Sequence, residues 1–121
     1  MQTITLPSSK YKVTFKDNIS YEEYESIEDA LLEGVENELE NPEETNPNKK
    51  VKQVFNPGAF KAQRIRKILA LVQNVESENG EQMDVKNAMN GLDMVDGALI
   101  VKKVNKIYND LKKKLAEIEK E

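Results

Sequence analysis

The 121-residue sequence contains no cysteine and no histidine, and these absences exclude much of protein chemistry. Without cysteine there is no disulfide, thiol nucleophile or thiolate metal site. Without histidine the chain lacks the commonest general base and the commonest ligand of transition metals. No glycine loop that would hold a phosphate is found, and nothing marks an apolar pocket that would make a carboxylate catalytic. We therefore expect a protein that is not an enzyme and that binds no metal or cofactor.

Long apolar runs are also missing. No segment approaches the roughly 20 apolar residues that span a bilayer, and the start, MQTITLPSSK, lacks the basic and apolar parts of a signal peptide. Apolar residues make up 38% of the chain and charged residues 33%, a balance typical of a thin core with long solvated helices. These features predict one domain over residues 1–121, located in the cytoplasm and without a membrane partner.

Charge is segregated along the chain, although the net charge is only −4. Every charged residue from Asp17 to Asn48 is acidic, and every one from Lys49 to Val75 is basic. Three interpretations stay open: two solvated helix faces of opposite sign near each other, docking of a partner through one face, or nucleic-acid binding by the basic block. The residues of that basic block are Lys49, Lys50, Lys52, Lys61, Arg64, Arg66 and Lys67.

Alternating apolar and polar residues around a PSSK turn predict a β-hairpin over residues 1–16. A lone hairpin is only marginally stable, so it must pack on a helix or on another chain. An acidic helix is expected over 20–40, with Ser20 and Glu23 forming a capping box. Its apolar stripe consists of Tyr24, Ile27, Leu31, Val35 and Leu39.

The rest of the chain predicts a loop and three further helices. Two Asn-Pro pairs and no periodicity indicate a loop over 41–55, and Pro57 begins a basic and apolar helix over 57–76. A short helix over 84–90 and a long one over 93–119 follow. The expected fold class is mainly α with a short N-terminal β-hairpin (α+β), a small helical domain of three to four helices.

The stretch GLDMVDGALIVKKVNKIYNDL admits three interpretations. A calcium loop counted from Asp84 would place Lys86 and Ala88 at ligand positions, which argues against a metal. A DNA-binding helix pair would place two aspartates at the end of the helix that approaches phosphates. The favoured interpretation is helix capping, with Asp93 as the cap and Asp96 as a carboxylate near the positive end of the helix dipole.

Two apolar surfaces are candidates for binding a partner. The helix over 57–76 is apolar around most of its second half, which is typical of a central or partner-covered helix. The last helix carries a narrow heptad seam that is either core or an association stripe, also for self-association. The candidate partner-binding residues are Phe60, Ile65, Ile68, Leu69, Val72, Val101, Val104, Tyr108, Leu111 and Leu115.

Two segments resemble tail assembly chaperones of long-tailed bacteriophages. ITLPSSKYKVTFKD, followed by an acidic helix, is similar to their opening strand, LPSG-K turn and second strand, although Ser9 stands where glycine is usual. LDMVDGALIVKKVNKI is similar to a segment in which a short turn opens a helix. The matching positions are Leu6, Pro7, Ser8 and Lys10 in the first segment and Asp96, Leu99, Val104 and Ile107 in the second.

The resemblance implies a protein that works in the host cytoplasm and binds and solubilises a helical client such as the tape-measure protein. It implies a protein client, either that one or the tail-tube protein, and possible homo-oligomers. The alternatives are a small regulatory nucleic-acid-binding module that uses the basic 49–67 block, a structural virion accessory protein, and a nucleic-acid mimic that uses the acidic helix.

Overall fold

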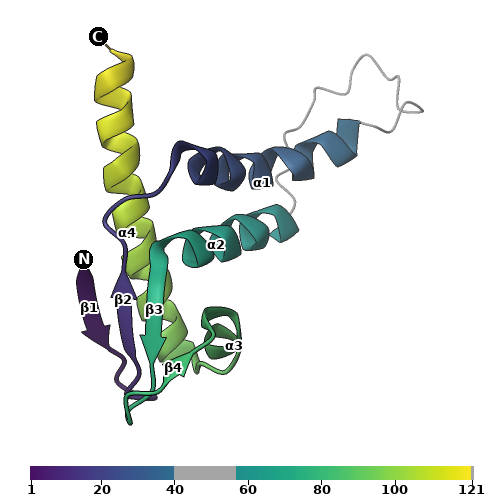
Figure 1. Cartoon of the computed structure of the whole chain (residues 1–121). Helices are drawn as coiled ribbons and strands as arrows, with labels where there is room; N and C mark the ends of the chain where they lie inside the picture. Colours follow the sequence, from purple (N-terminus) through teal and green to yellow (C-terminus); the bar gives the residue numbers. More distant parts are fainter. Residues whose placement is uncertain (40–56, 121) are drawn as a thin grey trace. The chain divides into compact units, whose positions relative to one another are not determined.

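The computed structural model describes residues 1–39 and 57–120, with the side chains of 32–39 and of Pro57 left aside (Figure 1). The described part holds four helices and one four-stranded antiparallel sheet, which confirms the expected α+β class. The predicted loop over 41–55 lies outside the described residues, as do the side chains predicted to end the first helix's stripe, Val35 and Leu39. The chain divides into two compact units, Met1–Ser20 with Lys67–Glu121 and Tyr21–Arg66. The single domain expected over the whole chain stays a prediction.

The predicted N-terminal hairpin is present. Strands β1 (Gln2–Thr5) and β2 (Lys12–Phe15) pair antiparallel, with Ile4 opposite Val13. The sheet continues beyond the hairpin in the order β1-β2-β3-β4, so β1 is an edge strand (Figure 1). The sheet is therefore twice as wide as the sequence alone predicted.

The two additional strands correct the prediction of a helix over 57–76. Helix α2 spans Pro57–Leu71 and ends where strand β3 (Val72–Glu76) begins, with no residue between them. Strand β4 (Gln82–Met83) completes a second hairpin. Residues 77–81 thus form the turn between these two strands.

A β-bulge explains why the strand resembled a helix. Val72 and Val75 are three residues apart, the spacing of neighbours on one helix face. In the sheet Val72 lies opposite Phe15 and Val75 opposite Val13, so β3 contains one more residue than β2 over this stretch. Gln73 is that extra residue. The bulge brings both valines to the buried side, and their branched side chains favour a strand.

Two residues with positive φ close the hairpin turns. Gly80 has a φ of 84° in the β3–β4 turn, where the Asn-Gly pair is a typical hairpin signal. In the β1–β2 turn the residue with positive φ is Lys10, at 65°, and not Ser9. Serine at the position where the resembling proteins have glycine is therefore compatible with this turn.

Helices α3 (Val85–Asn90) and α4 (Met94–Glu119) begin where the sequence predicted. The Asp84 side chain accepts a hydrogen bond from the Asn87 N–H, and Asp93 accepts one from the Asp96 N–H at 2.8 Å. Both aspartates are N-caps, which satisfy backbone donors that have no partner inside the helix. The capping interpretation of the last helix is confirmed.

Helix α4 crosses one face of the sheet and forms the core of the unit that contains both (Figure 1). Its buried apolar residues are Ile100, Val104 and Tyr108, spaced by four, and the sheet supplies the other side of this core. The buried residues on or beside the strands are Leu6, Val13, Phe15, Leu71, Val72 and Val75.

The second unit consists of α1 (Tyr21–Leu39) and the part of α2 up to Arg66, which run side by side in opposite directions (Figure 1). The Arg66 guanidinium donates a hydrogen bond of 2.7 Å to the Ser26 carbonyl oxygen, joining the two helices. Among the described side chains of α1, those of Ile27 and Ala30 are buried.

Candidate protein-binding site

Asp96 joins the first turn of α4 to the turn between β1 and β2. One carboxylate oxygen accepts the Ser8 backbone N–H at 3.0 Å, and the other accepts the Ser9 N–H at 2.8 Å. Asp96 is the one polar or charged residue in the described part of the chain that is fully buried. From the sequence, Asp96 was expected to interact with the helix dipole. The structure adds a contact with Ser8, which is 88 residues away in the sequence.

The electrostatics of this contact favour the charged carboxylate. Burial raises the pKa of Asp96, but the hydrogen bonds from the Ser8 and Ser9 backbones and hydroxyls together lower it by a larger amount. The pKa therefore lies below its ordinary value of 3.8. No buried polar side-chain atom of the described residues lacks a partner. The two segments that carry the family resemblance are therefore held together by a charged group whose bonds are all internal.

The low pKa of Asp96 predicts a specific dependence on pH. A carboxylate with a lowered folded-state pKa stabilises the fold above about pH 4, and this contribution is lost as the pH falls through the folded-state pKa. The difference in Tm between the wild-type protein and Asp96→Asn should therefore be largest above pH 5 and shrink between pH 4 and pH 2. Thermal unfolding followed by circular dichroism over this range tests it, and a difference that does not vary with pH contradicts it.

An exposed apolar surface lies on the first two turns of α4, next to the Asp96 contact. Met94 is 86% exposed, Val95 53% and Leu99 38%, and Ala98 between them is exposed too. At 100° per residue these four side chains cover about 140° of the helix circumference. We call them the α4 patch; Lys102 lies one turn further along, exposed, at its end.

The α4 patch was not among the residues predicted to bind a partner. The sequence did contain a signal for it. Met94 and Val95 lie in the first turn of the helix but outside its periodic core stripe, so their side chains are expected to be exposed. The core stripe runs along the same helix as the α4 patch. It contains Ile100 and Val104, and the patch residues lie outside it.

The structure divides the predicted partner-binding residues into three groups. Val72 on β3 and Val104 and Tyr108 on α4 are buried, so these three side chains are not exposed for a partner. Phe60, Ile65 and Leu69 on α2 are exposed. The remaining four are half-buried: Ile68, Val101, Leu111 and Leu115.

The ammonium groups of two lysines lie over the ring of the buried Tyr108. The Nζ atom of Lys67 lies 4.7 Å from the ring centroid and 3.5 Å from Asn105 Oδ1, and the Nζ atom of Lys112 lies 5.8 Å from the centroid. These are cation–π contacts, which are stronger where water is excluded. Lys67 and Arg66, both members of the basic block, thus make internal contacts, whereas Lys61 and Arg64 are exposed.

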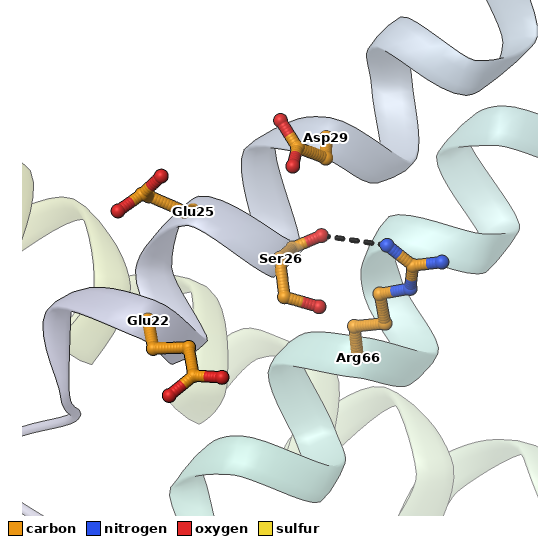
Figure 2. Close-up of a pocket in the computed structure, with 5 residues that line it drawn as sticks. All are labelled: Glu22, Glu25, Ser26, Asp29 and Arg66. Carbon is orange, nitrogen blue, oxygen red and sulfur yellow. Dashed lines mark hydrogen bonds between the residues drawn. The ribbon is translucent and has the colours of Figure 1, made fainter.

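An acidic, open cleft lies in the second unit, lined by Glu22, Glu25, Ser26, Asp29 and Arg66. Figure 2 shows that the three carboxylates do not converge on one point, and that the guanidinium of Arg66 is bonded to the Ser26 carbonyl oxygen. Within the part of the chain that the structure describes, no three acidic side chains converge as a metal ion requires. The cleft is therefore a solvated acidic surface.

Two further findings bear on the class of protein. Across residues 1–39 and 57–120, no helix is both long enough and apolar enough to span a membrane. Comparison of the chain with models of protein families, with curated proteins and with solved structures finds no match.

Proposed function

We propose that this protein is a non-enzymatic assembly factor of the tail chaperone kind, which binds and solubilises an amphipathic helix of a client such as a tape-measure protein. The observation that carries the proposal is the α4 patch. A contiguous exposed apolar surface at a fixed position on a folded unit is typical of a protein-binding site. Its place on the segment that resembles tail chaperones connects the surface with that family.

The chemistry of the patch suits a helical client. Side chains at i and i+4, such as Val95 and Leu99, interdigitate with the i, i+3 and i+4 residues of a partner helix. Lys102 at the end of the patch favours a client with an acidic residue beside its apolar stripe. The contact between Asp96 and the β1–β2 turn fixes the direction in which α4 presents these side chains.

The test is co-expression with the longest helical reading frame next to the gene, followed by pull-down at low and high salt. Apolar contacts survive salt, whereas binding through surface charge does not. Soluble, stoichiometric capture at high salt supports the proposal. Absence of capture, together with heparin or DNA binding that disappears as salt rises, overturns it in favour of a nucleic-acid-binding module. Stoichiometric presence in purified virions instead indicates a structural accessory protein.

Charge substitutions at the start of the patch should abolish capture without unfolding the protein. The double variant Met94→Glu with Val95→Glu places two carboxylates in the first turn of α4, where the helix dipole favours them. Because burying each apolar side chain contributes about 1.5–3 kcal/mol, we expect client affinity to fall at least about tenfold. Titration of the purified client, with binding followed by calorimetry, measures it.

The matched control is the double variant Asn109→Glu with Ala116→Glu. Both residues are exposed on the same helix and the change in net charge is the same. The control should bind the client as the wild type does. Equal losses in the two double variants mean that net charge, and not the α4 patch, determines binding.

A further inference from the structure

The outer edge of β1 is the second surface with the features of a binding site. Natural edge strands are protected by lysine, proline, a bulge or shortness, because their unpaired backbone groups accept further strands. Strand β1, QTIT, has no charge, no proline and no bulge, and the first nine residues of the chain carry no charged side chain. The opposite edge, β4, has only two residues.

The hydrogen-bond pattern shows which groups of β1 point outward. The Leu6 N–H donates to the Tyr11 carbonyl oxygen at 2.8 Å, and Ile4 opposes Val13 two residues further along the same register. Backbone groups alternate between the two sides of a strand, so those of Thr3 and Thr5 point to the outer edge. In the described residues, no backbone donor or acceptor outside the strand pairing is bonded to them.

We propose that β1 pairs antiparallel with β1 of a second copy, about a two-fold axis at Ile4. In this register Thr3 of each copy lies opposite Thr5 of the partner subunit, as two hydrogen-bonded pairs with two bonds each. The two four-stranded sheets then form one continuous sheet across the dimer. The inference concerns self-association and does not depend on the client-binding proposal.

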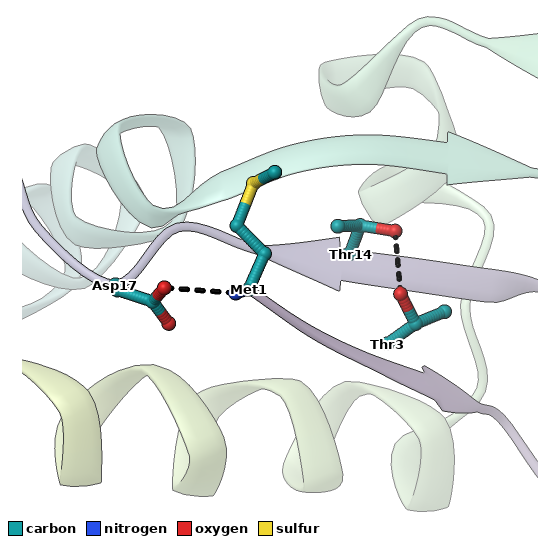
Figure 3. Close-up of polar contacts among 4 residues, drawn as sticks. All are labelled: Met1, Thr3, Thr14 and Asp17. Carbon is teal, nitrogen blue, oxygen red and sulfur yellow. Dashed lines mark hydrogen bonds and ion pairs between the residues drawn. The ribbon is translucent and has the colours of Figure 1, made fainter.

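A second copy fits this edge because the strand is complementary to itself. The register about Ile4 uses both outward residues of each copy, and the half-buried Ile4 meets its symmetry mate in a close, non-hydrogen-bonded pair. The threonines pair on the other face, as Thr3 and Thr14 already do, with 3.0 Å between their hydroxyl oxygens (Figure 3). Like charges do not meet at the interface, because β1 has none.

Self-association through one short strand is weak, so it should appear as the concentration rises. Two pairs of backbone hydrogen bonds and one apolar contact bury much less surface than a permanent dimer. Sedimentation equilibrium should therefore give the 13.8 kDa monomer at low micromolar concentration and a mass rising toward twice that value at several hundred micromolar.

A single cysteine tests the register. The natural chain has no cysteine, so Ile4→Cys introduces one thiol, whose symmetry mate lies directly opposite at a Cα separation of about 4.5 Å, within the range of a disulfide. In Gln2→Cys, on the same face, the register separates the two thiols by four residues, or about 13 Å. Mild oxidation should cross-link Ile4→Cys at least about tenfold faster than Gln2→Cys. Equal rates overturn the proposal.

The variant Thr3→Pro tests the hydrogen bonds. Its missing N–H points outward, so the pairing of β1 with β2 is kept while the intermolecular pair is lost. The variant should stay monomeric at all concentrations and keep the circular dichroism spectrum of the wild type. A dimer that persists in folded Thr3→Pro overturns the proposal. Loss of client capture in this variant, without cross-linking of Ile4→Cys, assigns the edge to an extended client segment and equally overturns it.

Discussion

Replacing Asp96 by asparagine is expected to lower the Tm by about 10 °C. The carboxylate accepts one N–H with each oxygen, from Ser8 and from Ser9. Asparagine has a single oxygen, so its amide NH₂ group faces the second N–H and leaves that buried donor without an acceptor. The charge that strengthens both hydrogen bonds is lost as well. Thermal unfolding at pH 7, followed by circular dichroism, measures the change.

Asp93→Asn is the matched control for this prediction. It removes the same charge from the same helix end, three residues away, but asparagine caps a helix as well as aspartate does. Its Tm should stay within about 2 °C of the wild-type value. Equal losses in the two variants mean that the helix dipole, and not the contact with the hairpin turn, accounts for the role of Asp96.

A second measurement separates local from global effects of Asp96→Asn. Amide hydrogen exchange at Ser8 and Ser9 reports directly on the two bonds, whereas exchange in the centre of β2 reports on the sheet. We expect the protection of the Ser8 and Ser9 amides to fall more than that of Val13. If the variant does not fold at pH 7, comparison of wild-type exchange at pH 6 and pH 3 tests the same contact.

Local chemistry explains which parts of the fold were predictable. The starts of α3 and α4 follow from Asp84 and Asp93, because an N-cap acts on amides only three residues away. The first hairpin follows from its alternation. The role of Asp96 was not predictable, since its partners are 87 and 88 residues away in sequence and a fully buried aspartate looks the same in the sequence as a solvated one.

The second hairpin shows how two local signals can disagree. The spacing of Val72 and Val75 indicated a helix, while Asn79 and Gly80 formed a hairpin turn signal. The turn signal was correct. A bulge shifts the alternation of a strand by one residue, so a bulged strand and a helix can present the same spacing of apolar residues over a short stretch.

The heptad seam of α4 was predictable from the sequence, but which of its residues are buried was not. Val104 and Tyr108, near the middle of α4, are buried. Helix α4 then continues beyond the ends of the strands (Figure 1). Leu115 is half-buried there and Ile118 is 66% exposed. The spacing of the seam is the same along the whole helix, but its residues differ in burial. Burial depends on which other elements pack against each part of the helix, and the spacing does not show this.

Replacing Tyr108 by alanine is expected to lower the free energy of unfolding by about 3–5 kcal/mol, the usual cost of removing a buried aromatic ring. The ring is buried, and the ammonium nitrogen of Lys67 lies 4.7 Å from the ring centroid. Tyr108→Phe keeps the ring and should cost much less. Urea unfolding of the three proteins measures the differences.

Leu115→Ala is the comparison that decides between core and partner surface. Leu115 follows Tyr108 by one heptad in the same seam but is only half-buried, so its replacement should cost about 1 kcal/mol or less. If Tyr108 is a core residue, Tyr108→Ala lowers the free energy of unfolding with or without a client. The free energies of unfolding of Tyr108→Ala and Leu115→Ala then differ strongly in the isolated protein. If both variants keep their stability and lose client capture equally, the seam is one continuous binding surface and the division of α4 into a core half and an exposed half is wrong.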